Sequence, residues 1–267
     1  MESYYNIKRK MFGDNEQIVV YSKPVVVGFD SPLKGRKMKD IIKQAKTLDE
    51  YKQRAYRSFK NSARRSKNKI YDYARANIWE WFVTITFDPE KVNSFNYDEC
   101  TKKLSKWLNN TKSRYCKDMK YLFIPELHKS KRYHFHGLIS NCTGLDFTDS
   151  GHKTDDGEVI YNIGKYKYGF TTATKVKDSQ RVSMYIAKYV TKELTSTVKG
   201  KRRYWQSKNC NKPTVEYHFN EKDTHRDLHD NLISMTGFTN AAEKEYVDSK
   251  GNNQYVRYYE YQFGGAV

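Results

Sequence analysis

Apolar and polar positions alternate most clearly in the middle of the chain. Residues 81–87 form a run of β-branched and aromatic side chains that stops at Asp88-Pro89. Such residues favour extended backbone and proline ends it, so the run predicts a buried strand. Asn96 stands where the next helix would begin, and an asparagine there can cap free backbone N–H groups.

Helical spacing follows Asn96. Apolar and small side chains recur mostly at steps of three and four residues, at Tyr97, Cys100, Leu104, Trp107, Leu108, Thr111 and Tyr115. This stripe is typical of an amphipathic helix that packs on a sheet. We assign these side chains to the core and expect no chemistry from them.

Three further segments have a clear period. Residues 120–128 and 133–140 are strand-like and joined by the short polar turn 129–132, which predicts an antiparallel hairpin. Residues 159–176, rich in Tyr, Gly and Thr, predict one or two more strands. Residues 180–194 return to helical spacing, with a stripe of Val182, Tyr185, Ile186, Tyr189 and Val190.

This order of elements predicts an α+β fold, in which helices pack against a central antiparallel sheet of about five strands. Before it, residues 51–76 carry nine cations and the single acid Asp72 at near-helical apolar spacing, which indicates a basic amphipathic helix. A chain of 267 residues has room for one core with extensions. We expect a basic N-terminal extension with a helix (1–76), a central domain (77–200) and a C-terminal extension of unassigned role (201–267).

The charge points to a polyanionic partner. Lysine and arginine number 49 against 31 acidic residues, a formal charge of +18, and 23 tyrosines are spread among them. Phosphate contacts release condensed counterions, and aromatic faces stack on unpaired bases, so nucleic acid is favoured over an anionic membrane surface. The alternative for the basic helix is a solvated face. The expected nucleic-acid contacts are Arg57, Lys60, Arg64, Arg65 and Lys67 of the helix, with Lys201, Arg202 and Arg203 of the basic-aromatic patch 199–205.

Other classes of protein are disfavoured. The four cysteines include no closely spaced pair that would indicate a zinc knuckle or a redox motif, and we expect a reducing interior. The longest apolar runs are far shorter than a membrane span, and the amino terminus lacks a signal pattern, so we expect no membrane association.

Two histidines lie in the predicted strand 133–140. Because side chains alternate across a strand, His134 and His136 share one face. Two imidazoles on one face can bind one divalent cation. Taken alone, such a pair is more often an ordinary pair of strand histidines.

A third ligand is available on the preceding strand. Glu126 lies eight residues before His134, and a hairpin turn at Ser130-Lys131 would bring it alongside the histidines. A carboxylate and two neutral imidazoles leave coordination positions for water and a phosphate oxygen, which suits Mg²⁺ or Mn²⁺. His128 has the same parity as Glu126 and is the alternative ligand, although a hard carboxylate suits these ions better.

Tyrosines and lysines repeat with a period of four in the predicted helix 180–194. On a helix this spacing puts Tyr185 beside Tyr189 on one face and Lys188 beside Lys192 on the next, so two phenols could face one metal ion. A pair of core tyrosines is the commoner meaning of that spacing.

These stretches together resemble the motifs of the HUH endonuclease superfamily, in particular the rolling-circle replication initiators of small phages and plasmids. Residues 82–87 resemble the first motif, His134-Phe-His136 the second, and residues 185–192 the third in its two-tyrosine form, as in microvirus initiators. Glu126 stands where related initiators of single-stranded DNA viruses carry their third ligand. The resemblance spans residues 78–194.

The resemblance implies a metal-dependent DNA endonuclease and strand transferase. Its metal would act as a Lewis acid on the scissile phosphate while a tyrosine oxygen attacks in line, giving a 5′-phosphotyrosine and a free 3′-hydroxyl. Since a free phenol titrates near ~10, the metal and Lys188 or Lys192 would stabilise the developing charge.

The expected partner is single-stranded DNA at a replication origin, in the cytoplasm of a bacterial host. The chain has no phosphate loop ending in Gly-Lys-Ser or Gly-Lys-Thr, so a host helicase and polymerase are also expected.

Two alternatives remain open. A relaxase or single-strand transposase of the same superfamily tends to carry a third histidine near the pair or one late tyrosine, and the sequence has neither. A non-catalytic single-stranded nucleic-acid-binding protein would explain the charge and the tyrosines. It would leave Glu126, His134 and His136 without a role.

Overall fold

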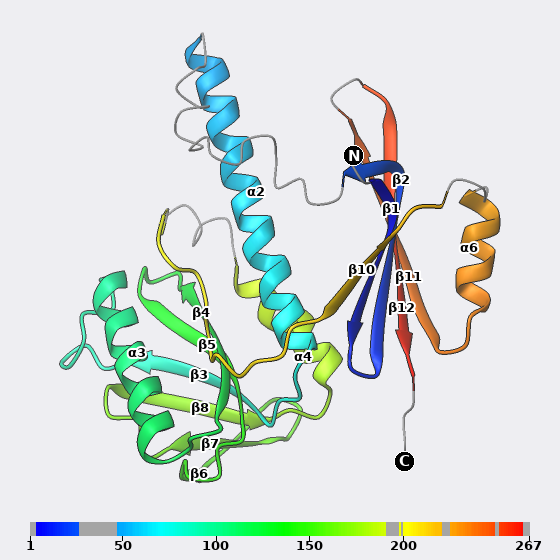
Figure 1. Ribbon diagram of the computed structural model, residues 1–267. Helices are drawn as coiled ribbons and strands as arrows, with labels where there is room; N and C mark the ends of the chain where they lie inside the picture. Colours follow the sequence, from blue (N-terminus) through cyan, green and yellow to red (C-terminus); the bar gives the residue numbers. More distant parts are fainter. Residues whose placement is uncertain are drawn as a thin grey trace. The chain divides into compact units, whose positions relative to one another are not determined.

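The computed structural model describes residues 4–26, 47–190, 198, 200–220, 225–248 and 251–263. Contacts divide the chain into a central unit, residues 45–211, and a terminal unit formed by residues 1–44 and 212–267. The central unit contains α2 (Leu48–Arg75), β3 (Trp81–Phe87), α3 (Tyr97–Arg114), β4 (Lys120–Leu127), β5 (Tyr133–Ser140), β6 (Phe147–Lys153), β7 (Val159–Ile163), β8 (Gly169–Lys175), α4 (Ser179–Ile186), the 3-10 turn η1 (Ala187–Tyr189) and β9 (Trp205–Gln206) (Figure 1).

The central unit is built on one antiparallel sheet of seven strands in the order β6-β7-β8-β3-β5-β4-β9. The α+β class is confirmed. The sheet is wider than the predicted five strands because β6 and β9 extend its two edges. The seven residues of β6 are mostly polar and exposed, and β9 has two residues, so neither carries a hydrophobic alternation.

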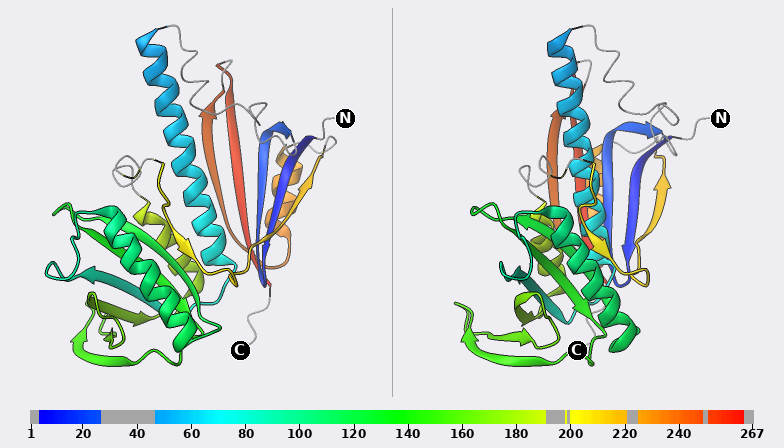
Figure 2. Two further views of the ribbon diagram at one scale, coloured as in Figure 1. Left: turned by 60° about the vertical axis from the view of Figure 1, so that its left-hand side comes forward. Right: turned by 90° about the vertical axis from the view of Figure 1, so that its left-hand side faces the viewer.

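One face of the sheet is covered by α3. Asn96 caps this helix, as predicted, because its side-chain oxygen accepts hydrogen bonds from the backbone N–H groups of Asp98 and Glu99. The buried stripe of α3 packs on inward-facing side chains of β3, β4 and β5 (Figure 2). The members of this core include Leu104, Trp107, Val83, Ile85, Phe123, Phe135 and Ile139.

The other face meets α2 and α4. Ile70 and Ala74 near the end of α2, and Ile186 at the end of α4, pack on Ile124 and Leu138 of the sheet. The predicted basic helix is confirmed, from Leu48 to Arg75. It belongs to the central unit, so the division by contacts differs from the expected boundaries at 76 and 200.

The last predicted helix is shorter than its sequence period. The α-helix ends at Ile186 and continues as η1 to Tyr189, after which Val190 leaves helical geometry. Residues 191–197 lie outside the described residues. The predicted site residue Lys192 is among them.

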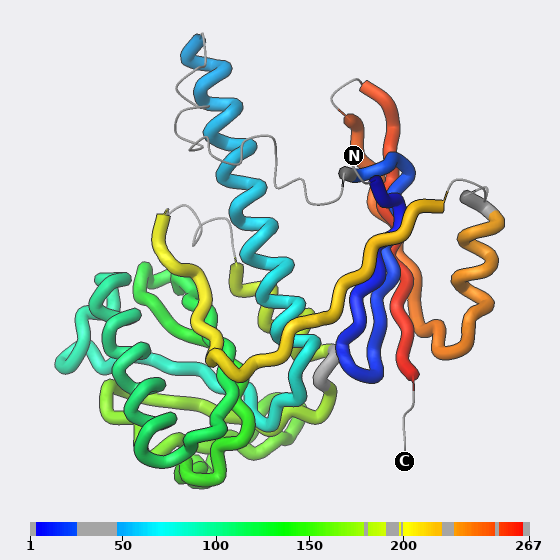
Figure 3. The backbone as a smooth tube through the Cα atoms, in the orientation of Figure 1, coloured from blue at the N-terminus to red at the C-terminus, as the bar shows by residue number. Residues whose placement is uncertain are grey.

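The terminal unit is a second antiparallel sheet, which the sequence pattern did not predict. Its elements are β1 (Tyr4–Phe12), β2 (Asn15–Val26), β10 (Thr214–His218), α6 (His225–Ser234), β11 (Phe238–Val247) and β12 (Asn253–Gln262), with strand order β10-β1-β2-β12-β11. Early and late segments of the sequence therefore lie side by side, as the blue, orange and red tubes of Figure 3 show. Leu232 of α6 packs on Ile18, Tyr259 and Tyr261.

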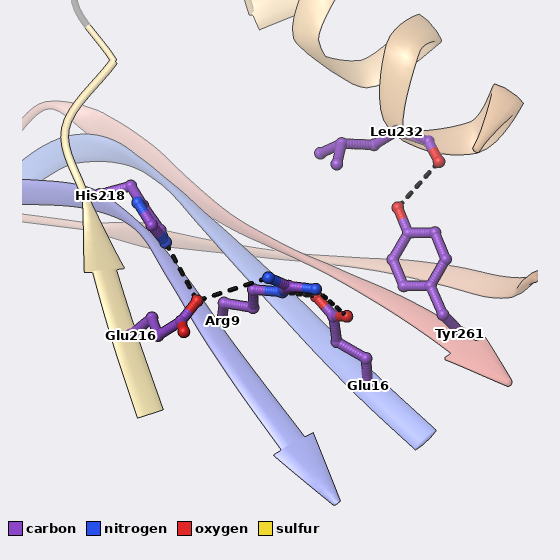
Figure 4. Close-up of polar contacts among 6 residues, drawn as sticks. All are labelled: Arg9, Glu16, Glu216, His218, Leu232 and Tyr261. Carbon is purple, nitrogen blue, oxygen red and sulfur yellow. Dashed lines mark hydrogen bonds and ion pairs between the residues drawn. The ribbon is translucent and has the colours of Figure 1, made fainter. Parts of the chain in front are cut away.

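Polar contacts tie these strands together. Arg9 on β1 forms ion pairs with the buried carboxylate of Glu16 on β2 and with Glu216 on β10 (Figure 4). The Glu16 carboxylate raises the pKa of Arg9, because it stabilises the charged guanidinium. The Tyr261 hydroxyl donates to the Leu232 carbonyl at 2.8 Å and so joins α6 to the sheet.

The close packing at Gly137 gives a test of the central sheet. A Cβ atom at Gly137 would lie 2.3 Å from ring carbons of the fully buried Phe123, so Gly137→Ala should lower the free energy of unfolding by about 1–3 kcal/mol. Urea unfolding followed by circular dichroism measures this change. Gly164→Ala is the matched control, since its Cβ would meet its nearest atom only at 3.9 Å. Equal midpoints for the two variants would contradict the packing.

Candidate functional site

The β4–β5 hairpin brings the predicted carboxylate to the predicted histidines. Its antiparallel register pairs Glu126 directly with His134. The side chain of Glu126 reaches diagonally to the neighbouring histidine, and its Oε2 lies 2.7 Å from Nε2 of the buried His136. His134 and His136 are thus on the sheet face that meets α4, opposite α3, as alternation along β5 requires.

Two threonines of β3 orient the imidazoles. Thr84 pairs with His136 and Thr86 with His134 in the β3–β5 register. Thr84 Oγ1 lies 3.1 Å from His136 Nδ1, and Thr86 Oγ1 lies 3.2 Å from His134 Nδ1. A threonine hydroxyl can accept a proton from Nδ1–H, which leaves the Nε2 lone pair available to a ligand. This is the orientation that metal-binding histidines commonly require.

The alternative ligand His128 is held differently. Its Nδ1 accepts a hydrogen bond from the backbone N–H of Ser130 at 3.3 Å. A neutral imidazole with this acceptor carries its proton on Nε2, which then has no free lone pair. The His128 ring centre is 5.2 Å from that of His134. This hydrogen bonding fits Glu126 better than His128 as a third ligand.

Local charges favour the ligand forms of these groups. The hydrogen bond from His136 lowers the pKa of Glu126, against the opposing effect of partial burial. Burial lowers the pKa of His134, and the nearby His128 and His136 lower it further. At neutral pH the site therefore presents a carboxylate and a neutral His134.

Both predicted tyrosines reach this face. The Tyr189 ring stacks on His136 with a centroid distance of 3.7 Å and an interplanar angle of 14°. Tyr189 Oη donates a hydrogen bond to Tyr185 Oη at 2.9 Å. The pKa of Tyr189 is raised, first by burial and then by this hydrogen bond, which stabilises its neutral form. Phe82 of β3 lies against the Tyr185 ring at 5.4 Å.

The predicted lysines differ in what the structure describes. Lys188 Nζ lies 5.3 Å from the ring centre of Tyr185, in the range of a cation–π contact. Its side chain is exposed, so the ammonium group can also reach an anionic substrate. Lys192 is outside the described residues.

The donor set can be compared with what a metal ion requires. Among the described residues, no group of three His, Cys, Asp or Glu side chains is arranged to hold an ion as it stands. Glu126 and His136 instead contact each other directly. Binding would exchange this hydrogen bond for two metal–ligand bonds, so side-chain rearrangement is required. The oxygen and imidazole chemistry itself fits Mg²⁺ or Mn²⁺.

The predicted nucleic-acid contacts fall into two groups. The cations that α2 contributes are exposed, as are Lys201 and Arg202, although Lys201 Nζ pairs with Asp98 at 2.6 Å. Arg203 is instead 8% exposed, and its Nη1 donates to the Ser62 hydroxyl of α2 at 3.0 Å. Arg203 therefore fastens residues 200–206 to the helix and is not a surface cation. The exposed cations of α2 are Arg57, Lys60, Arg64, Arg65 and Lys67.

Sequence reasoning missed the residues around the ligands. It treated 82–87 as one motif and gave no role to the hydroxyls of Thr84 and Thr86. It also missed a groove of about 510 Å³ beside Tyr185, whose lining includes Thr172 and Arg181. The period-two spacing of the threonines, in phase with the histidines, was the available signal.

Comparison with known proteins finds one matching family. Residues 80–194 match the model of a family of replication-associated proteins that is named after ORF2. The match contains the histidines, Glu126 and both tyrosines, and it supports a replication-associated role for this part of the chain. No curated protein and no solved structure matched.

A separate search concerned membrane spans. Within the described part of the chain, every helix is too short or too polar to cross a membrane.

The depressed pKa of His134 predicts how its neighbour acts. Because the charge on His128 disfavours a second imidazolium, His128→Ala should raise the pKa of His134 towards its ordinary value of 6.5 in metal-free protein. NMR titration of the imidazole resonances measures this shift. The folded state keeps this pKa below the unfolded value, so His134 should weaken folding as the pH falls through 6.5.

The control for this titration is His152→Ala. His152 is exposed on β6, and four strand positions separate β6 from β5 in the sheet. Its removal should leave the pKa of His134 where it was. A fall, or no change, after His128→Ala would contradict the assignment.

Proposed function

We propose that this chain is a DNA nicking and joining enzyme that initiates rolling-circle replication. It cuts one strand at an origin through a tyrosine and leaves a 5′-phosphotyrosine and a free 3′-hydroxyl. One observation carries the proposal: Tyr189 stacks on His136 at 3.7 Å, while His136 contacts Glu126 and Tyr189 contacts Tyr185. A phenol pair and a candidate ligand set thus share one sheet face.

In this proposal His134, His136 and Glu126 hold Mg²⁺ or Mn²⁺. The ion, when bound, polarises the scissile phosphate and offsets its developing charge. Thr84 and Thr86 keep the Nδ1 atoms of the histidines occupied, so that the Nε2 atoms face the site. The lowered pKa of Glu126 keeps this ligand ionised.

The tyrosines supply the nucleophile. A phenol oxygen attacks phosphorus in line, the bond from phosphorus to the 3′ oxygen breaks, and the strand remains attached by its 5′ phosphate. The phosphotyrosine ester preserves the phosphodiester energy, so joining requires no nucleotide. Lys188, beside Tyr185, offsets negative charge as the bond forms, and Lys192 has the same proposed role.

DNA binding is assigned to the exposed cations. The cations of α2, together with Lys201 and Arg202, neutralise phosphates of the strand on either side of the cut. We also propose that a host helicase and polymerase act with the chain in the bacterial cytoplasm. The chain would then supply the nick and the joining step, and the host the unwinding and synthesis.

The chemistry is tested with labelled single-stranded fragments that tile the replicon encoding the chain, incubated with Mn²⁺ and run on a denaturing gel. One fragment should yield a protein-linked 5′-phosphate product. The product should disappear with a chelator and with the double variant Tyr185→Phe/Tyr189→Phe, which removes both nucleophiles. Tyr115→Phe, an exposed tyrosine on the α3 side, is the matched control. A covalent product from the double variant would refute the nucleophile assignment.

Metal binding is tested separately by Mn²⁺ titration with electron paramagnetic resonance. His136→Ala should weaken Mn²⁺ binding by at least about tenfold, because even second-shell changes at metal sites have effects of that size. His128→Ala should change the affinity little, since its Nδ1 is already engaged by Ser130. Equal losses in the two variants would argue for His128 as a ligand.

A further inference from the structure

The two tyrosines occupy different environments. Tyr185 is 43% exposed and lines the groove of about 510 Å³ with Phe82, Thr84 and Arg181. Tyr189 is half-buried, and one face of its ring lies on His136. A strand lying in the groove therefore meets the oxygen of Tyr185 first.

The hydrogen bond between the phenols has a direction. Tyr189 Oη is the donor and Tyr185 Oη the acceptor, at 2.9 Å. A donated hydrogen bond stabilises negative charge on the oxygen that accepts it. The proton of Tyr189 is occupied by this contact, whereas Tyr185 keeps its own proton free for release.

The surroundings of Tyr185 also favour attack from this residue. Lys188 Nζ lies 5.3 Å from its ring centre, and Phe82 meets the ring edge to face at 68°. The ammonium group adds positive charge near the phenol, and the phenylalanine limits its rotation. The phenol is therefore held at the border of the groove beside a cation.

We infer that Tyr185 makes the first attack and that Tyr189 is a positioning residue in that step, an inference that rests on the proposed function. The Tyr185 Oη–phosphorus bond forms as the bond to the 3′ oxygen breaks. The phenol proton passes to water in the open groove, and the 3′ oxygen takes a proton from water. No oxidant, reductant or nucleotide enters the balance.

The same geometry assigns the second step. Once Tyr185 is esterified, its oxygen carries no negative charge and accepts hydrogen bonds poorly. The hydroxyl of Tyr189 is then released from its partner, beside His136, and becomes the nucleophile that receives the strand in the next transfer.

The test maps the first covalent adduct on full-length protein. The fragment that reacts in the tiling assay is quenched at an early time with Mn²⁺ present, the protein is digested, and the nucleotide-linked peptide is located by mass spectrometry. The adduct should be on Tyr185 in the wild type and absent in Tyr185→Phe. An adduct on Tyr189, or equal amounts on both, would overturn the inference.

The role of Tyr189 is tested by Tyr189→Phe, which keeps the ring on His136 and removes only the hydroxyl. Adduct formation on Tyr185 should slow on the order of 10- to 100-fold, the effect of losing one hydrogen bond to a charged group. Binding of the same fragment, measured by fluorescence anisotropy with Ca²⁺, should be unchanged. An unchanged rate, or weakened binding that accounts for the loss, would overturn the positioning role.

Failure of the proposed function gives a different result. If the wild type forms no adduct on any tyrosine with any fragment, the nicking activity itself is refuted, and this inference with it. If the wild type forms an adduct on Tyr189 alone, nicking stands and only the order of attack falls. Circular dichroism melting of both variants verifies that they fold.

Discussion

The central unit depends on the register of three antiparallel strands. β5 lies between β3 and β4, and every candidate ligand contact crosses one of these two ladders: Thr84 to His136, Thr86 to His134, and Glu126 to His136. Because side chains alternate, a slip of one residue would turn both histidines into the core and Phe135 towards the site. The packing of α3 on Phe135 therefore fixes the site on the opposite face.

That opposite face is shared between packing and chemistry. Leu138 follows His136 on the same face of β5 and is buried under α2 and α4. Ile186 anchors α4 on this apolar part, and the turn η1 then carries Tyr189 onto His136. The distance between the phenols and the histidines is thus set by an ordinary hydrophobic contact a few residues away. Polar groups alone would not hold it.

Local patterns predicted most of this unit. The strand 81–87, the Asn96 cap and the hairpin of β4 and β5 agree with the structure to within a residue, because each has a strong period or a marked terminus. The face shared by His134 and His136 followed from parity alone. The burial of Arg203 could not be predicted, since it depends on Ser62 of a helix 141 residues earlier. The 3-10 turn at Tyr189 was equally hidden, because the tyrosine spacing fits a continuous helix.

The terminal sheet was missed for a related reason, and its topology affects synthesis. β2 pairs with β12, so Ile18 finds its partner Tyr259 only after nearly the whole chain has been made. Contacts so distant in sequence close slowly. The central unit, whose strands are neighbours in sequence, is complete much earlier on the ribosome. During translation β1 and β2 therefore wait with exposed edges, which the nascent chain must keep from pairing with other strands until its last segment emerges.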